Sequence, residues 1–168
     1  PSQQCDDFND GNISNWGNKL GTWTATGGYM KGNSNTTDAR TTSPFGTFGA
    51  TSINCDIRMN TGRTSRIARI VFAYRDANNY RFAQFDDVAN TVRIYDRVNR
   101  RNNLKASASV GMSSGVWYNV TVTIASGGNV SVLNNGTTLL SYNFGNVITG
   151  LVGVGFNKSN TDFDDFCV

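Results

Sequence analysis

The sequence predicts an all-β fold, a two-sheet antiparallel β-sandwich that forms one domain over residues 1–168. The chain contains 18 Gly and only 2 Pro, and no long segment carries apolar residues at helical spacing. Short segments with alternating apolar and polar residues recur at the intervals typical of sandwiches. A domain of this length buries about two thirds of the surface of its unfolded chain, so a second domain is not expected.

The first clear strands are predicted at residues 50–59 and 66–75. In the earlier one, Ile53, Cys55 and Ile57 share one face. The later one is expected to place two sets of residues on opposite faces: Ala68, Ile70, Phe72 and Tyr74 toward the core, and Ile67, Arg69, Val71, Ala73 and Arg75 away from it.

The remaining strands follow as hairpins. Gly and Asn in the intervening turns supply the positive φ that such turns need, so the sequence indicates a meander of roughly a dozen strands. Trp117 begins a strongly alternating segment and is expected to pack against the core. These strands are predicted at residues 79–85, 90–98, 117–124, 130–133, 137–144 and 150–156.

The composition excludes several kinds of chemistry. The chain contains no His, and all 12 acidic residues are Asp. It therefore lacks the imidazole of Ser-His-Asp and Cys-His nucleophile systems and of His-ligated zinc sites. Charge is unevenly distributed, because residues 58–105 contain 11 basic and 4 acidic side chains. This segment is expected to attract anions.

Paired carboxylates stand between apolar residues near both ends of the chain, in CDDF (5–8) and FDDF (163–166). Strict alternation would place one carboxylate of each pair beside buried aromatic surface, which is costly for an unpaired charge. If the two chain ends pair as neighbouring strands, their carboxylates come together and could surround a hard cation such as Ca²⁺. Asp38 and carbonyls near Gly32 are weaker candidate ligands, and solvated strand-end aspartates are the alternative.

The three cysteines, Cys5, Cys55 and Cys167, fit no CxxC metal or redox spacing. Juxtaposed ends would allow a Cys5–Cys167 disulfide and leave Cys55 as a buried thiol. A bridge from Cys55 to either terminus is the alternative that the sequence leaves open. One disulfide and a polar surface favour a secreted, extracellular protein, and no apolar segment reaches membrane length.

Several motifs together resemble a known family over essentially the whole chain, in order: DDFND, GTW, GGYMKG, ARIVFAYRDANNY, VRIYDRVN, GVWYNVTV and GLVGVGFNKSNTDFDDFCV. They are similar to the laminin-G-like, concanavalin-type jelly-roll modules of bacterial polysaccharide-active enzymes. The resemblance implies a concave glycan-holding face and a structural Ca²⁺ between the terminal segments. It implies Asp7 and Asp165 as ligands, with Asp6 and Asp164 as alternates.

The predicted ligand face lies on the outer side of the strand at 66–75. Arg69 and Arg75 project from it, and the neighbouring strands are expected to add Arg81 and Phe85, then Arg93, Tyr95 and Arg97. Arg forks match carboxylate or sulfate groups, and Tyr offers a flat apolar ring. We therefore expect an anionic polysaccharide here, and the alternative is that the arginines only keep the sheet soluble.

The leading interpretation is a non-catalytic carbohydrate-binding module that is monomeric or part of a larger secreted polysaccharide-degrading enzyme. A lyase that uses Arg with Tyr80 or Tyr95, and a laminin-G-like adhesion domain, are the alternatives. A neutral glycan would instead need an aromatic platform, for which Trp16, Trp23, Tyr29 and Tyr80 are candidates. With only four Lys, the chain is not expected to bind nucleic acid, and no membrane partner is expected.

Overall fold

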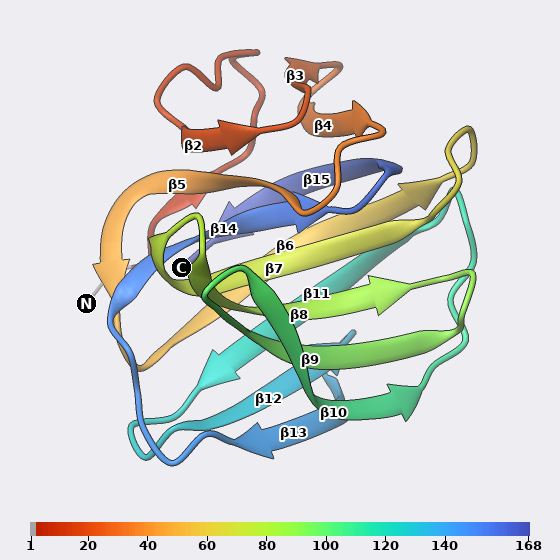
Figure 1. Ribbon diagram of the computed structural model, residues 1–168. Helices are drawn as coiled ribbons and strands as arrows, with labels where there is room; N and C mark the ends of the chain where they lie inside the picture. Colours follow the sequence, from red (N-terminus) through yellow and green to blue (C-terminus); the bar gives the residue numbers. More distant parts are fainter. Residues whose placement is uncertain (1–2) are drawn as a thin grey trace.

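Two antiparallel β-sheets packed face to face form the molecule (Figure 1). The computed structural model describes residues 3–168, and over this range it contains strands and turns but no helix. Within these residues there is accordingly no helix long and apolar enough to cross a membrane. The predicted all-β sandwich is confirmed.

Sheet A has the strand order β13-β12-β11-β6-β15-β4-β3, with β1 paired to β15, and sheet B has the order β10-β9-β8-β7-β14-β5-β2. The strands are β1 (Cys5–Asp6), β2 (Gly17–Leu20), β3 (Trp23–Thr26), β4 (Tyr29–Ser34), β5 (Ala39–Phe48), β6 (Thr51–Asn60), β7 (Ile67–Asp76), β8 (Asn79–Asp86), β9 (Thr91–Val98), β10 (Arg101–Ser109), β11 (Trp117–Ile124), β12 (Asn129–Asn134), β13 (Thr137–Asn143), β14 (Gly150–Phe156) and β15 (Ser159–Cys167).

Alternation builds the core between the sheets. Ile53, Cys55 and Ile57 of β6 are fully buried, as predicted, and they face the sandwich interior with Ile70 and Phe72 of β7. The central strands β6 and β7 thus have an apolar inner face and an outer face that points away from the partner sheet.

The predicted hairpins are confirmed, but the simple meander is not. Asn135 and Gly136, with φ of 48° and 79°, form the tight turn that joins β12 to β13. In the centre of each sheet, however, strands distant in sequence pair: β6 lies between β11 and β15, and β14 lies between β7 and β5. The chain therefore changes sheet repeatedly, as in a jelly roll.

A β-bulge changes the predicted faces of β7. Ala73 has a φ of 51° and the pairing with β8 shifts register after Phe72. Phe72 and Ala73 therefore both join the main core, and Tyr74 turns to the outer face beside Val71. The prediction that Tyr74 faces the core and Ala73 faces outward was wrong for this reason.

The two chain ends lie side by side (Figure 1). Cys5 of β1 is paired directly with Cys167 of β15, and the two residues form a disulfide across 162 positions of sequence. Backbone hydrogen bonds between Gln4 and Val168 extend this pairing. Cys55 is a buried free thiol, which confirms the predicted pairing against its alternatives.

A second bulge corrects the predicted faces of FDDF. Asp165 has a φ of 48°, and the register of β15 with β6 shifts between Asp164 and Cys167. Phe163 and Phe166 consequently both enter the core at 0% exposure, while Asp165 is exposed and Asp164 half-buried. Neither carboxylate has to lie in the core, contrary to strict alternation.

Replacement of both Cys5 and Cys167 by Ser is expected to lower the free energy of unfolding by about 2–5 kcal/mol, because the open chain gains conformational freedom when unfolded. The measurement is urea denaturation at pH 7 of the wild type and the double variant. Cys55→Ala is a control for loss of a thiol that is not bridged. An unchanged midpoint in the double variant would contradict the role of the disulfide.

Candidate functional site

The outer face of sheet B gathers four of the six predicted ligand residues, Arg69, Arg93, Tyr95 and Arg97. We call it the Arg69 face. Arg69 extends from β7, and the other three lie on β9, two positions apart, so that alternation directs all of them to the same side.

One row of directly paired residues crosses this face from β5 to the edge strand β10. Arg69 pairs with Gly155 on one side and with Gln84 on the other, and its Nε donates a 2.9 Å hydrogen bond to Oε1 of Gln84. An added Cβ at Gly155 would lie 2.6 Å from the carbonyl oxygen of Ala39, so the row has no side chain there. From β5 to β10 the row contains Arg40, Gly155, Arg69, Gln84, Arg93 and Ser107.

The next rows form an apolar floor. Phe82 is fully buried and stacks on Tyr95, with ring centroids 4.9 Å apart and an interplanar angle of 18°. The centre of the Tyr80 ring is 5.8 Å from that of Phe82 and 5.4 Å from that of Tyr74. The guanidinium carbon of Arg69 lies 4.3 Å from the centre of the Phe82 ring and covers it.

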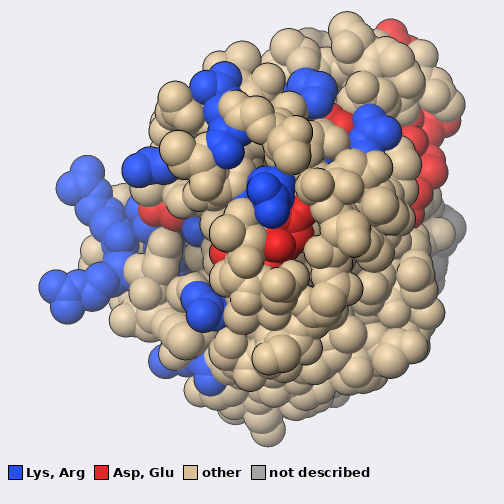
Figure 2. All heavy atoms as spheres, turned by 90° about the vertical axis from the view of Figure 1, so that its right-hand side faces the viewer, with Lys and Arg blue, Asp and Glu red and all other residues tan. Residues whose placement is uncertain are grey.

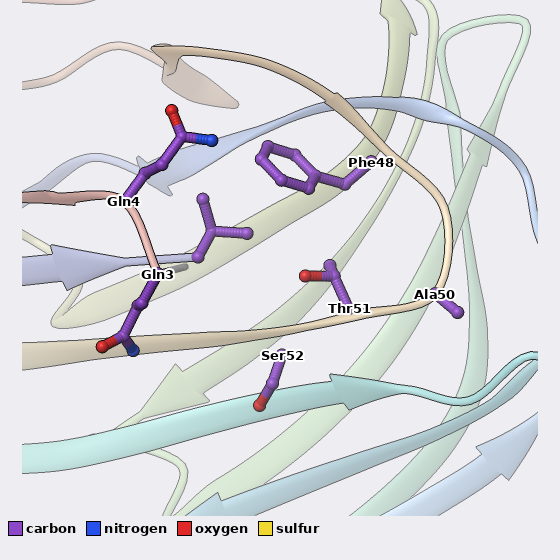
Figure 3. A pocket seen from close by; sticks show the side chains of 7 residues that line it. Gln3, Gln4, Phe48, Ala50, Thr51 and Ser52 are labelled. Atoms are coloured by element: carbon purple, nitrogen blue, oxygen red, sulfur yellow. The ribbon is translucent and has the colours of Figure 1, made fainter. Parts of the chain in front are cut away.

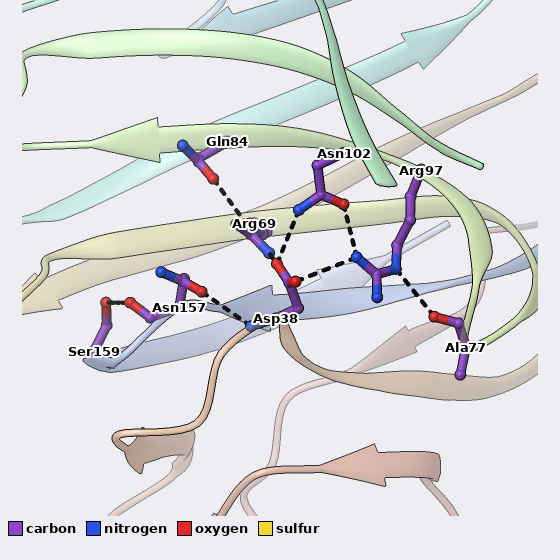
Figure 4. A network of polar contacts seen from close by, with 8 residues as sticks. All are labelled: Asp38, Arg69, Ala77, Gln84, Arg97, Asn102, Asn157 and Ser159. Atoms are coloured by element: carbon purple, nitrogen blue, oxygen red, sulfur yellow. Dashed lines mark hydrogen bonds and ion pairs between the residues drawn. The ribbon is translucent and has the colours of Figure 1, made fainter. Parts of the chain in front are cut away.

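Asp38 connects the arginines above this floor (Figure 4). Its Oδ1 accepts from Nη1 of Arg69 at 2.7 Å, and its Oδ2 accepts from Nη1 of Arg97 at 3.2 Å. Nδ2 of Asn102 donates to Oδ1 at 3.0 Å, and Oδ1 of Asn102 accepts from Arg97 at 2.9 Å. The network fixes the orientation of both guanidinium groups.

A loop between β4 and β5 places Asp38. Its φ is 52°, a left-handed conformation that Asp tolerates better than most residues. Its backbone N–H donates to Oδ1 of Asn157 at 3.0 Å, and the backbone carbonyl of Asn157 accepts from Ser159 at 2.7 Å. Asp38 was expected as a weak metal ligand, but its carboxylate is instead paired with two cations.

The Arg69 face retains an excess of positive charge. Its four arginines, Arg40, Arg69, Arg93 and Arg97, outnumber its two carboxylates, Asp38 and, at the end of β8, Asp86. Nε of Arg40 is shielded from solvent and has no hydrogen-bond partner. On the side of the molecule that Figure 2 shows, basic side chains are spread over much of the surface, whereas acidic ones gather mainly along its right-hand edge and near its centre.

Arg75 and Arg81 do not share this face, contrary to expectation. Arg81 lies between Tyr80 and Phe82 in β8, so its side chain points to the inner side of sheet B. There its guanidinium carbon is 3.8 Å from the centre of the Phe144 ring, and its Nε is 3.6 Å from Oδ1 of Asp96. Phe85 lies in the main core on that same side. The bulge at Ala73 reverses the direction of Arg75, which is exposed.

The predicted metal residue Asp6 is held by protein donors. Its Oδ1 accepts from the N–H of Phe8 at 2.9 Å, and its Oδ2 accepts from Nε1 of Trp16 at 2.8 Å. Trp16 is 2% exposed, and its ring packs against Phe166. Asp6 thus attaches the early loop to the C-terminal strand.

The other terminal carboxylates lie close together. Burial and the nearby charges of Asp56 and Asp7 raise the pKa of Asp165 above its ordinary value. Burial, Asp165 and Asp56 similarly raise the pKa of Asp164. Among residues 3–168, no three Asp or Cys side chains are gathered as a ready metal site, so these residues contain no preformed ligand cluster.

A cavity of about 330 Å³ lies beside the chain ends (Figure 3). None of the predicted ligand residues borders it. Its lining is uncharged in its side chains and consists of Gln3, Gln4, Phe48, Ala50, Thr51, Ser52 and Val168.

Sequence reasoning missed Asp38, Asn102 and Arg40 as members of the site. Asp38 lies 31 residues from Arg69 and 59 from Arg97. Nothing local in the sequence marks it as their partner. Asp38 precedes a strand and lies outside the basic segment at residues 58–105, so its local sequence does not indicate that it pairs with these arginines.

Asp38→Asn is expected to destabilise the protein by about 1–3 kcal/mol at pH 7, because two poorly exposed guanidinium groups lose their carboxylate. Burial opposes ionisation of Asp38, but the hydrogen bond and charge of Arg69, with Asn102 and Arg97, outweigh it and lower the pKa below its ordinary 3.8. A lowered folded-state pKa gives stability that is present above the unfolded pKa and lost as pH falls through the folded value.

Urea denaturation of both proteins between about pH 2 and 7 measures this effect. The difference in unfolding free energy should be constant above about pH 5 and shrink below the ordinary pKa of Asp. A difference that stays constant down to pH 2 would rule out the ionised Asp38 carboxylate as its source.

Comparison with known proteins gives no match to a family model and no match among curated sequences. Solved structures do match. A carbohydrate-binding module, CBM66 from Bacillus subtilis, superimposes with a TM-score of 0.83 at 18% identity, over 92% of this chain and 95% of that one.

Two further structures share the fold at lower similarity. The carbohydrate recognition domain of Emp47p has a TM-score of 0.63 at 12% identity, over 98% of this chain and 93% of that one. The Crh5 transglycosylase has a TM-score of 0.69 at 9% identity, over 99% and 83%. The chain therefore has the jelly-roll fold on which carbohydrate-binding modules are built, and this fold is also found in enzymes.

Proposed function

We propose that the protein is a non-catalytic carbohydrate-binding module that holds a polysaccharide on its Arg69 face. The observation that carries the proposal is the Asp38 network, which fixes Arg69, Arg97 and Asn102 above an aromatic floor. An ordered set of polar groups over apolar surface suits sugars, whose rings have apolar faces and whose hydroxyl groups need directed hydrogen bonds.

The accessible groups on this face match that requirement. Asn102 and Tyr95 are half-buried and retain donor and acceptor capacity at the surface. Arg93 makes one weak contact, at 3.3 Å to the hydroxyl of Ser107, so its guanidinium is available to a ligand. Because Arg69 and Arg97 are already oriented, binding would order few additional side chains.

The finer proposal is that the polysaccharide is anionic and that the Arg69 face is the concave face implied by the resemblance. Four arginines against two aspartates, Asp38 and Asp86, leave positive charge that a uronate carboxylate or a sulfate would neutralise. Arg40 has no salt-bridge partner among the described residues, so its charge adds to this excess.

The pKa of Tyr80 favours a binding role over catalysis. Burial raises the pKa of Tyr80 above its ordinary value of 10.0. Its hydroxyl is thus a poor base at neutral pH, which weakens the lyase alternative. The similar solved structures described as a carbohydrate-binding module and a carbohydrate recognition domain support the same choice.

The Cys5–Cys167 disulfide is compatible with an extracellular location. We propose that the module is secreted, that it acts as a monomer or as part of a larger polysaccharide-degrading enzyme, and that it concentrates that enzyme on its substrate. Nucleic acid and membrane are not proposed as partners.

Affinity electrophoresis in native gels containing alginate, polygalacturonate, xylan or chondroitin sulfate tests the function. We expect retardation in at least one anionic gel, weakening as salt is raised because the contacts are ionic. Absence of retardation in all four gels would overturn the proposal. Release of products that absorb in the ultraviolet would replace the binding role with a lyase.

A matched pair of variants tests the face. Arg93→Gln removes one positive charge from the Arg69 face and should weaken binding about tenfold, equivalent to about 1.4 kcal/mol. Arg75→Gln removes the same charge from an exposed position off the face and should leave affinity unchanged. Equal losses in both variants would show that only net charge matters.

We further propose a structural Ca²⁺ near Asp7 and Asp165, with Asp6 and Asp164 as alternates. The donor chemistry fits, because carboxylate oxygens are the ligands that Ca²⁺ prefers. The charges of Asp56 and Asp7 repel that of Asp165, and none of the three has a salt-bridge partner among the described residues. A bound cation would relieve this repulsion. Asp6 is the weakest candidate because its oxygens already accept two protein hydrogen bonds.

Calcium at a hundred times its Kd should stabilise the protein by about 2.7 kcal/mol, because the ion binds only the folded state. Thermal unfolding in millimolar CaCl₂ and in a chelator measures the shift. Asp165→Asn should abolish it, whereas Asp10→Asn, at an exposed turn, should not. Identical melting curves with and without Ca²⁺ for the wild type would refute the proposed ion.

A further inference from the structure

Trp117 is exposed on the outer face of sheet A, although the sequence predicted it to pack against the core. Its exposed fraction is 37%, against 2% for Trp16 and 8% for Trp23. Alternation along β11 places Val120 and Val122 in the core and Trp117 on the opposite side. We call this side the Trp117 face. It is on the other sheet from the Arg69 face.

A second row of paired residues supports Trp117. From β11 to β4 it contains Trp117, Arg58, Asp162 and Lys31, each directly opposite the next. Asp162 is fully buried, and its carboxylate is 2.8 Å from both Nζ of Lys31 and Nη2 of Arg58. The buried carboxylate therefore holds both cations in place.

Arg58 in turn fixes the aromatic rings. Its guanidinium carbon lies 4.4 Å from the centre of the Trp117 ring and 5.2 Å from that of Tyr29. The two rings are 5.8 Å apart and nearly perpendicular, at 73°. Trp117 is thus both exposed and immobilised, so a ligand that stacks on it would lose little side-chain entropy from the protein.

Polar groups surround the rings. The side chains of Lys31 and Arg58 are 29% and 25% exposed, so their remaining donors can be reached from solvent. Asn60 donates to Asp162 at 2.8 Å, and Asn160 accepts from Lys31 at 2.7 Å, which leaves further amide donors and acceptors along the row.

The charge balance here differs from that of the Arg69 face. The outward-facing side chains of β4, β15 and β6 include two basic residues and three acidic ones: Lys31, Arg58, Asp56, Asp162 and Asp164. An anionic chain would meet no excess of positive charge. A neutral ligand with a flat apolar face and many hydroxyl groups fits this surface better.

We propose that the Trp117 face is a second carbohydrate-binding site that takes a neutral, β-1,4-linked pyranose chain stacked on Trp117. Such chains are extended and flat, and they present axial C–H groups to an aromatic ring. The row from Trp117 to Lys31 covers three inter-strand spacings, or about 14 Å, so the site suits an oligosaccharide. This site is separate from the proposed anionic site and does not depend on it.

The test uses cellohexaose and acrylamide quenching of tryptophan fluorescence. Trp117 is the exposed member of the three tryptophans, so it should dominate quenching. Cellohexaose at millimolar concentration is expected to protect it in the wild type and in Arg93→Gln. Isothermal titration should give a Kd that rises about tenfold or more in Trp117→Ala, as for loss of a central aromatic contact.

A purely structural role for Trp117 gives a different result. If the ring only shields the Arg58–Asp162 pair, Trp117→Ala will change the melting temperature of the protein. Cellohexaose will then neither bind the wild type nor protect its Trp117 from acrylamide, and the proposal fails. Trp117→Phe keeps a ring and should retain part of the affinity if the alanine variant does not fold. Cellohexaose binding that is lost in Arg93→Gln but kept in Trp117→Ala would assign the sugar to the Arg69 face and overturn the second site.

Discussion

A poorly exposed carboxylate shared between two cations stands at the centre of the outer face of each sheet. On sheet B, Asp38 is paired with Arg69 and Arg97, and on sheet A, Asp162 is paired with Arg58 and Lys31. A charge removed from water needs such partners, so each carboxylate fixes long side chains that would otherwise move freely in solvent. Pairs of this kind contribute less to stability than to defined geometry. The ordered surface chemistry of the protein depends on them.

The two faces differ in what surrounds the shared carboxylate. Beneath Asp38 lies a closed aromatic floor, and Arg40 and Arg93 add unneutralised charge around it. Beside Asp162 lie an exposed Trp117 ring and further carboxylates. The same fold thus offers a cationic surface on one side and a neutral aromatic one on the other. Jelly-roll domains can hold ligands on their sheets because the core between the sheets already provides stability, which leaves the outer faces free for recognition.

Two β-bulges determine which side chains reach these surfaces. The bulge at Ala73 brings Tyr74 to the Arg69 face and turns Arg75 away from it. The bulge at Asp165 lets Phe163 and Phe166 share the core while both intervening carboxylates stay outside. In each case one extra residue in the strand restores core packing that strict alternation would have broken.

The sequence by itself determined the all-β class, most strand positions and the core alternation of β6. These features follow from periodicity and from local turn residues such as Asn135 and Gly136, which act over a few positions of chain. Tertiary structure alone decided the two bulges, the pairing of β6 with β15, and the partnership of Asp38 with Arg69 and Arg97. Those arrangements arise from contacts between residues tens to more than a hundred positions apart, where the requirement to pair a desolvated charge or to fill the core overrides the local pattern.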